Sequence, residues 1–411
     1  MGRIRNYFLL SVTVATVMLS VQMHIVENHV FDSNPSMLRF EQWEKESGNI
    51  RATNKASVPK NGKKSCDEIV DDDQDADEDL KPILKILCRG GYDVSKNSEK
   101  VDRSILPKWS EILDFYGPPK ILGLETCSIY RNKVKQQARH VAPAGLFNTG
   151  TNLLDNVIDE NCDFQNTDYR STDWMTFQVP WGKHIPFSYR LNHTAWKFQD
   201  YNLDPTNALP VLSVKDPYTW MQSMCKQPYA AQYDHSKSTC PNIVPYESDI
   251  KAHPRFAKMK YIPVHVKYDQ TNGLVKKYQS MAHLWNEWNS EYIKIHEHNN
   301  TMKSPTDFPF IVVRLEDLTF HGETVIPQIC ECAGGTLKGE IKQIAKIANQ
   351  NHAVDMSSGK MSGLLRSIVK YGNITRRREG YPDFQLEAAK EVLDPKLMNL
   401  LRYPYEESKV S

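Results

Sequence analysis

The segment HVAPAGLFNTGTN, residues 140–152, runs directly into the helix-like sequence LLDNVIDEN. The pattern predicts an apolar strand, a loop of small residues and the first turn of a helix. Such an arrangement directs several backbone N–H groups at one point and can hold a phosphate. Gly145 and Gly150 have the G-x-x-x-x-G spacing of a P-loop, but Thr151 and Asn152 stand where a nucleoside triphosphatase has Lys and Ser or Thr. The segment therefore predicts a phosphate site without the magnesium-triphosphate apparatus.

Around this segment, apolar β-branched runs alternate with amphipathic helices. The pattern predicts strands at 140–147, 208–214 and 308–314 and helices at 151–159, 218–225 and 273–296. Strands that alternate with helices are typical of a parallel sheet covered on both faces. We therefore expect residues 105–411 to form an α/β fold with a P-loop-like parallel sheet flanked by helices.

Polar residues follow the other predicted strands where each strand ends. The strand at 208–214 is followed by Lys215, and Ser223 comes about two turns into the next helix. Ligands bind beyond the carboxyl ends of parallel strands, and a lysine and a hydroxyl in this relation can bind one phosphate together. Taken singly, these residues are explained equally well as a snorkelling lysine and a helix cap. Their order along the chain favours a binding site.

The chain begins with a short basic tail, residues 1–6, followed by YFLLSVTVATVMLSVQM at 7–23, which carries no charge. Seventeen such residues are near the lower limit for crossing a bilayer, and the preceding basic residues favour a cytoplasmic N-terminus. A cleaved signal peptide is the alternative, but no clear small-x-small cleavage site precedes Gln22. We favour a retained signal anchor, which makes the chain a single-pass type II membrane protein.

Residues 24–104 are polar and include the acidic run DDDQDADED at 71–79. Blocks of like charge usually stay solvated and disordered, so this part is expected to be a largely disordered lumenal stem. The segment LKPILKILC at 80–88 is expected to form a short helix within the stem. The acidic run lacks the spacing of an EF-hand, which argues against calcium binding.

The cysteines and sequons are compatible with the secretory route. The eight cysteines form an even set, and N-x-Ser/Thr sequons begin at Asn192, Asn299 and Asn373. The pairing of the cysteines is not readable from their spacing. Cys330 and Cys332 have no second ligand pair at zinc spacing, and we expect no metal. A net charge of +1 gives no indication of a nucleic-acid partner.

Four motifs, in this order, resemble those of the sulfotransferase superfamily, whose members use 3′-phosphoadenosine 5′-phosphosulfate (PAPS). The sequence FNTGTN at 147–152 is similar to the family's 5′-phosphosulfate loop. Lys215, Pro217 and Ser223 are similar to the family's 3′-phosphate motif, with Lys in place of Arg. The Trp- and Tyr-rich segment 283–292 with VVRLEDL at 312–318, and LDPKLMNLLRY at 393–403, resemble two later family features. The resemblance spans residues 142–403.

The resemblance implies donor-binding roles. The residues that would hold the 5′-phosphate are Asn148, Thr149, Gly150, Thr151 and Asn152. The residues that would hold the 3′-phosphate are Lys215, Ser223 and one or more of Arg376, Arg377 and Arg378. Asn148 stands where the family has a lysine that contacts the bridging oxygen of the donor, and an amide cannot neutralise charge on the leaving phosphate. Another cation would have to take that role.

Two adjacent residues between the nucleotide motifs are the catalytic candidates. Sulfuryl transfer to an alcohol needs a base for the hydroxyl proton and cations around the sulfuryl and leaving-group oxygens. His184 is assigned the base role and Lys183 the role of stabilising charge, by similarity to a Lys-Thr-His segment of cytosolic members. A hydrogen-bonded structural histidine is the alternative for His184.

The sequence thus predicts a PAPS-dependent sulfotransferase in the Golgi membrane with a lumenal catalytic domain. The expected acceptor is a hydroxyl on a carbohydrate of a glycoprotein, polysaccharide or glycolipid, by analogy with membrane-tethered members. A non-catalytic sulfotransferase-like glycoprotein that binds glycan or a partner protein is the alternative, favoured by Asn148 and Lys215 replacing the family residues. A nucleotide-dependent kinase is a third hypothesis, against which Thr151 and Asn152 argue.

Overall fold

The computed structural model describes residues 64–95, 101–164, 178–195, 203–235, 239–269, 273–298, 308–344 and 363–404. The expected tail and anchor at 1–23, and the expected stem up to residue 63, lie outside these residues. Among the described residues, no helix has both the length and the apolar character needed to cross a bilayer.

The central sheet contains the strands that the sequence predicted and one that it did not. It consists of β1 (Ile121–Leu122), β2 (His140–Ala144), β4 (Ala208–Val214) and β8 (Ile311–Arg314), in the order β1-β8-β4-β2. β2, β4 and β8 are parallel, whereas β1 is antiparallel to β8. The α/β class is confirmed, but the sheet is mixed rather than parallel throughout. A two-residue strand is too short to produce a periodic pattern in the sequence.

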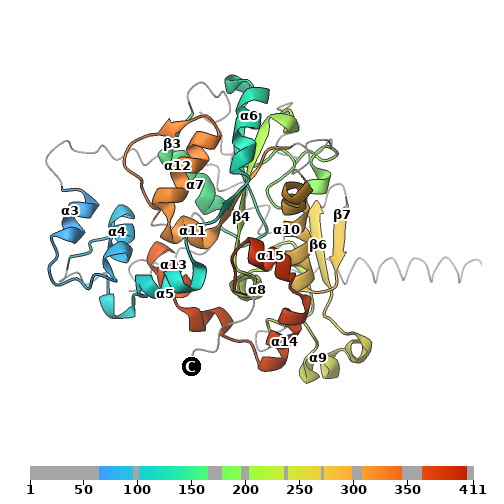
Figure 1. The fold of residues 1–411 in the computed structure, drawn as a ribbon. Coiled ribbons are helices and arrows are strands. Elements are labelled where there is room, and N and C mark those ends of the chain that lie inside the picture. The colour runs from blue at the N-terminus through green and yellow to red at the C-terminus, as the bar shows by residue number, and fades with distance from the viewer. Residues whose placement is uncertain are drawn as a thin grey trace, which may run out of the picture. The chain divides into compact units, whose positions relative to one another are not determined.

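Helices cover both faces of this sheet (Figure 1). Val141, Val211 and Val313 face α6 (Cys127–Lys133), α7 (Thr151–Asn161) and α12 (Gly322–Cys332). The alternate residues Ala142, Leu212 and Val312 face α8 (Pro217–Lys226), α10 (Met281–His298) and α13 (Gly363–Tyr371). Burial on both faces explains why these strands are continuous apolar runs without polar alternation.

A second, antiparallel sheet packs beside α10 and corrects one predicted helix (Figure 1). It contains β5 (Ala231–Gln232), β6 (Val264–Asp269) and β7 (Leu274–Tyr278). The helix predicted at 273–296 was wrong at its start, because β7 occupies the first residues and α10 begins only at Met281. Ser280 supplies the start signal, since its hydroxyl accepts a hydrogen bond from the backbone N–H of His283.

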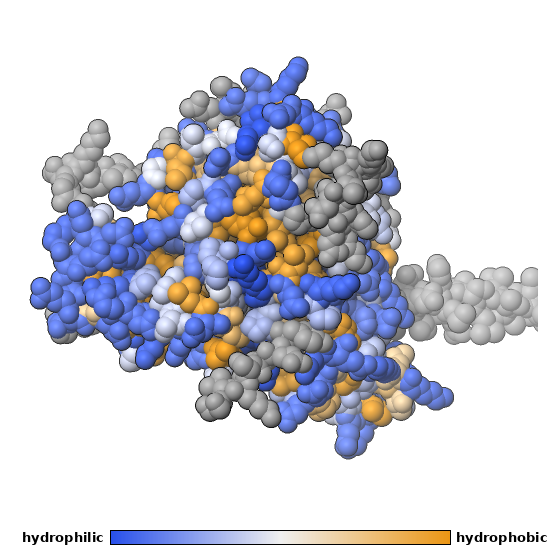
Figure 2. Space-filling model, viewed as in Figure 1, coloured by the Kyte–Doolittle hydropathy of each residue, from blue (hydrophilic) through white to orange (hydrophobic). Residues whose placement is uncertain are grey.

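The C-terminal part of the expected stem is an ordered helical hairpin, which corrects the prediction of disorder for this part. α3 (Cys66–Asp71) and α4 (Lys81–Arg89) are joined by the Cys66–Cys88 disulfide, and Leu84 and Leu87 of α4 are buried in the main core. The acidic run lies on the outer, hydrophilic side (Figure 2). Arg103 pairs with Asp73 at 2.6 Å, so nearby cations offset part of the repulsion. The short helix expected at 80–88 is confirmed as α4.

The remaining elements are short. They are α5 (Trp109–Tyr116), β3 (Cys162–Asp163), α9 (Glu247–Ala252), α11 (Leu315–Phe320), β9 (Thr336–Leu337), α14 (Asp383–Val392) and α15 (Pro395–Leu400). All eight cysteines are paired, and the remaining disulfides are Cys127–Cys332, Cys162–Cys330 and Cys225–Cys240. The disulfide-bonded character expected from the even cysteine count is confirmed.

Candidate anion-binding site

The loop between β2 and α7 wraps tightly at the carboxyl end of its strand. A Cβ atom on Gly145 would lie 2.5 Å from Thr149 Oγ1 and 2.7 Å from the Ser213 carbonyl oxygen, so only glycine fits there. Gly150 has φ of 82° and immediately precedes the first helical residue, Thr151. The loop therefore places backbone N–H groups at a helix N-terminus, which is the geometry that the sequence predicted for a phosphate site.

Asn148 connects the loop to the end of α8. Its φ of 62° lies in the left-handed region, which Asn tolerates better than most residues. Its Nδ2 donates to the Gln227 carbonyl oxygen at 2.8 Å and contacts Met224 Sδ at 3.2 Å. The buried Thr149 hydroxyl donates to the Leu146 carbonyl oxygen at 2.7 Å. The side chains of Asn148 and Thr149 thus stabilise the conformation of the loop, and its backbone N–H groups are the groups best suited to bind an anion.

Lys183 and His184 lie against this loop. The Lys183 Nζ donates to Asn152 Oδ1 at 2.8 Å, and the Lys183 carbonyl oxygen accepts from Gly145 N at 2.8 Å. The His184 Nδ1 lies 2.7 Å from the Gly145 carbonyl oxygen. A carbonyl only accepts, so Nδ1 carries the proton and the neutral ring has its lone pair on Nε2. Trp288 Nε1 donates to the His184 carbonyl oxygen at 2.9 Å, which anchors this segment to α10.

Lys215 and Ser223 are in direct contact beyond the end of β4. The Lys215 Nζ donates to Ser223 Oγ at 2.8 Å, and Ser223 Oγ donates to the Thr219 carbonyl oxygen at 2.9 Å. Lys215 is only 2% exposed. Its ammonium also lies 5.1 Å from the ring centroid of Tyr371. The structure therefore brings together the lysine and hydroxyl that the sequence assigned to one phosphate.

Lys370, on α13, is a second lysine at this position and was missed by the sequence analysis. Burial, together with the charges of Lys215 and Lys226, lowers the pKa of Lys370 to about 8. Burial likewise lowers the pKa of Lys215 to about 8. The Lys370 ammonium lies 5.7 Å from the centroid of the Tyr371 ring, which Lys215 also contacts. Two half-buried or buried cations that repel one another favour an anionic ligand. Nothing in the local pattern around Lys370 indicates this neighbour.

Two buried carboxylates, those of Glu316 and Asp216, lie near Lys215. Glu316 accepts hydrogen bonds from the backbone N–H of Asp216 at 3.1 Å and from the Tyr403 hydroxyl at 2.8 Å. Burial, together with the nearby charge of Asp216, raises the pKa of Glu316 to about 7. Both carboxylates raise the pKa of Lys215 and so oppose burial, which lowers it. The charge of Lys215 therefore interacts with that of Glu316, a buried acid just after the neighbouring strand β8.

The three arginines at 376–378, called the basic run below, differ in burial. Arg377 is 2% exposed and its Nε donates to Asp216 Oδ2 at 2.7 Å, while Nη2 donates to the Pro404 carbonyl oxygen at 2.9 Å. Burial opposes the charge of Arg377, but Asp216 raises the pKa of its guanidinium above the usual value. Arg376 is exposed and Arg378 is half-buried. Arg377 therefore supports the N-terminus of α8, where Asp216 is the N-cap.

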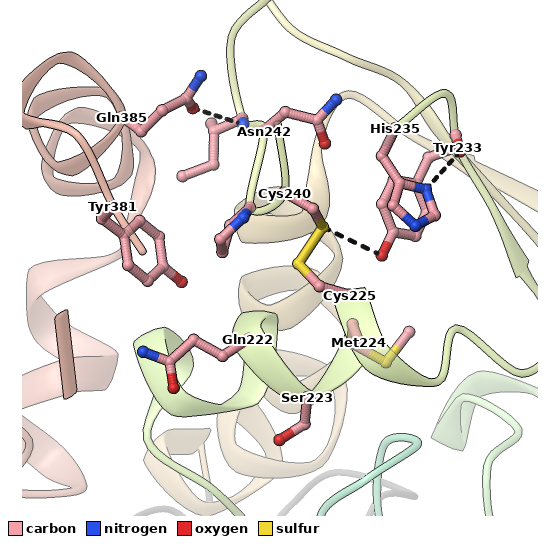
Figure 3. Close-up of a disulfide and its surroundings, with 12 residues drawn as sticks. Gln222, Ser223, Met224, Cys225, Tyr233, His235, Cys240, Asn242, Tyr381 and Gln385 are labelled. Atoms are coloured by element: carbon pink, nitrogen blue, oxygen red, sulfur yellow. Dashed lines mark hydrogen bonds between the residues drawn. A yellow bond between two sulfur atoms is a disulfide. The ribbon is translucent and has the colours of Figure 1, made fainter. Parts of the chain in front are cut away.

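The Cys225–Cys240 disulfide holds the segment that follows α8, described at 227–235 and 239–246, at the end of that helix. Figure 3 shows this bond above the helix, with the Ser223 side chain pointing away from it. Gln385, on α14, accepts from Ile243 N at 2.7 Å and donates to the Val244 carbonyl oxygen at 2.6 Å. The segment is therefore attached at two places, next to the helix that carries Ser223.

An aromatic cluster connects this segment to His184. The Phe147 ring lies 4.6 Å from the His184 ring, 5.7 Å from Tyr229 and 6.4 Å from Tyr268, measured between centroids. The rings of Tyr229 and Tyr268 are nearly parallel to that of Phe147. His184 thus lies beside a cluster of aromatic rings as well as beside the loop between β2 and α7.

No group of three or more His, Cys, Asp or Glu side chains suited to a metal ion is found within the described ranges. Comparisons with protein-family models, with curated proteins and with solved structures found no match.

Proposed function

We propose that the protein is a PAPS-dependent sulfotransferase. The contact of Lys215 with Ser223, beside Lys370 and next to a phosphate-type loop, is the observation that carries the proposal. The donor has two separate phosphate groups, and the described residues offer two separate anion-binding elements. One is the backbone of the loop from Gly145 to Gly150 at the start of α7. The other is the cationic cluster formed by Lys215, Ser223 and Lys370.

The 5′-phosphosulfate would bind the loop backbone, with Lys183 close by. Lys183 reaches Asn152 from outside the loop and so can supply the positive charge that Asn148 lacks. The 3′-phosphate would bind Lys215, Ser223 and Lys370. Arg377 is assigned to Asp216 instead, because its guanidinium already binds that carboxylate.

In the proposed reaction, an acceptor hydroxyl oxygen attacks the sulfur, and the bond between sulfur and the bridging phosphate oxygen breaks. The hydroxyl proton passes to Nε2 of His184, and 3′-phosphoadenosine 5′-phosphate leaves with the bonding electron pair. The hydrogen bond from His184 Nδ1 to Gly145 orients Nε2 for this role. Lys183 and the loop N–H groups stabilise the charge that develops on the leaving phosphate.

A carbohydrate hydroxyl is the proposed acceptor. The half-buried rings of Tyr229 and Tyr268 stack on the buried Phe147, which adjoins His184, and they are the rings against which a sugar is proposed to pack. Together with the uncharged segment 7–23 and the four disulfides, this supports a Golgi membrane protein with a lumenal catalytic domain.

The first test is calorimetric titration of the purified full-length protein with 3′-phosphoadenosine 5′-phosphate, with magnesium-ATP as comparator. We expect micromolar binding of the bisphosphate and much weaker binding of ATP. Lys215→Met and Ser223→Ala should weaken the bisphosphate, whereas Lys133→Met, an exposed lysine of α6 on the other face of the sheet, should not. A folded protein that does not bind the bisphosphate would contradict the proposal.

A non-catalytic glycan-binding protein is the second candidate. It is favoured by Asn148, whose side chain is bonded to Gln227 and leaves the usual cation position of the loop without a lysine. Transfer of radiolabelled sulfate from PAPS to a panel of oligosaccharides separates the two. Bisphosphate binding without transfer to any acceptor would favour the second candidate.

A further inference from the structure

We propose that Asn373 carries an asparagine-linked oligosaccharide. This inference does not depend on the proposed function, because it concerns the outer side of the turn that contains the basic run. Asn373, Ile374 and Thr375 form a sequon, and all three residues are exposed. Exposure of the whole acceptor tripeptide is the first requirement for modification.

The hydrogen bonds within the sequon end on the amide oxygen of Asn373. Asn373 Oδ1 accepts a hydrogen bond from the backbone N–H of Thr375 at 3.0 Å and from the Thr375 hydroxyl at 2.7 Å. Both bonds end on the amide oxygen and cap the 3₁₀ helix Ile374–Arg378. Glycosylation takes place on Nδ2, and a glycosylated amide keeps its carbonyl oxygen as an acceptor. The cap therefore survives the modification.

The inner side of the same turn is occupied by protein. Gln222 Nε2 donates to the carbonyl oxygens of Arg376 and Arg377, each at 3.0 Å, and Arg377 is bound to Asp216. An oligosaccharide on Asn373 would leave these contacts in place, because it extends from the exposed side of the turn. The inner side of this turn therefore packs against the protein, and its outer side exposes Asn373 for modification.

The disulfides support passage through the compartment where this modification occurs. All eight cysteines are paired, and two of the bonds join segments far apart in the chain, Cys127–Cys332 and Cys162–Cys330. Such bonds form in the oxidising secretory lumen, where asparagine-linked oligosaccharides are also attached. In the Asn192 sequon, Asn192 and Thr194 are exposed but His193 is half-buried and bound to Asp269, whereas Asn299 lies outside the described residues.

The test is peptide mapping of the full-length protein produced in secretory cells. Trypsin cleavage after Lys370 and Arg376 releases YGNITR, residues 371–376. We expect this peptide to appear only after enzymatic deglycosylation, with Asn373 converted to Asp and labelled by heavy-oxygen water. Unmodified YGNITR as the main form, from protein whose disulfides have formed, would overturn the proposal.

Three variants separate the glycan from the cap. Asn373→Asp keeps an oxygen acceptor for Thr375 but cannot be glycosylated, and Thr375→Ser keeps both the hydroxyl and the sequon. Thr375→Ala removes the sequon. We expect the glycan in Thr375→Ser and its loss in the other two. Because none of these readouts requires PAPS, failure here and failure of the sulfotransferase proposal are distinguishable.

Discussion

The ammonium of Lys215 donates a 2.8 Å hydrogen bond to the hydroxyl of Ser223, eight residues further along the chain on α8. Burial is unfavourable for the charged form of Lys215 in the free protein and lowers its pKa to about 8. A buried cation beside Lys370 is better explained by ligand binding than by a contribution to folding. The relationship therefore leads to predictions that distinguish a binding residue from a structural one.

Lys215→Met should weaken binding of 3′-phosphoadenosine 5′-phosphate by about 10- to 100-fold, as expected for the loss of a charge-assisted hydrogen bond. The same variant should raise the free energy of unfolding of the free protein at pH 7, by on the order of 1 kcal/mol, because a desolvated cation is removed. Titration calorimetry and urea unfolding check the two effects. A large loss of stability would instead assign Lys215 a structural role.

Bisphosphate affinity should fall as the pH rises above 8. Lys215 and Lys370 each have a pKa of about 8, and binding requires their protonated forms. If the bound phosphate restores both pKa values to the ordinary range, each lysine contributes about a tenfold loss of affinity between pH 7 and pH 9. Lys370→Met should remove one of these two steps. An affinity that is constant over this range would contradict the assignment.

Glu316→Gln should change the pH dependence of stability below pH 7. The folded-state pKa of Glu316 is raised to about 7, so the folded protein binds more protons than the unfolded chain between the ordinary carboxyl pKa of 4.5 and 7. Its contribution to stability is fully present below pH 4.5 and is lost as the pH rises to 7. The Gln variant should lack this loss. Denaturant unfolding from pH 4 to 8 measures the difference.

Arg377→Ala should destabilise the fold, whereas Arg376→Ala should not. Arg377 is bound to the buried Asp216, and removing one partner of a buried ion pair costs about 3–5 kcal/mol. Arg376 is exposed, so its loss should change stability by less than about 0.5 kcal/mol. A double-mutant cycle with Asp216→Asn should show strong coupling with Arg377. Additive effects would mean that the ion pair is not formed in solution.

Asn148→Lys tests whether the loop lacks a cation. The residue has φ of 62°, so the substitution should cost about 1 kcal/mol and lose the hydrogen bond to Gln227. We expect turnover in the proposed sulfuryl transfer to stay within about twofold, because Lys183 already supplies positive charge. Asn148→Gly, which tolerates this φ, is the matched control for the backbone. A tenfold gain in turnover with Lys would show that Lys183 does not fill the role.

Several features of the fold and the site follow from local patterns. β4 occupies the predicted residues, and α7 begins at the predicted residue Thr151. Lys215 stands just before Asp216, the N-cap of α8, and Ser223 lies about two turns into that helix, so the long lysine side chain reaches the hydroxyl. The helix at 273–296 was wrong at its start because a short alternating strand beside a long helix is easily included in it.

By itself, the sequence determined the apolar strands, the tight loop at Gly145 and the even cysteine count, because each depends on residues adjacent in the chain or on composition. Only the tertiary structure placed Lys370 near Lys215, bound Arg377 to Asp216, and packed α4 of the expected stem into the core. These pairings join segments more than a hundred residues apart. The attraction of Arg377 for Asp216, the repulsion between the two lysines and the burial of α4 all arise only once the helices have packed against the sheet.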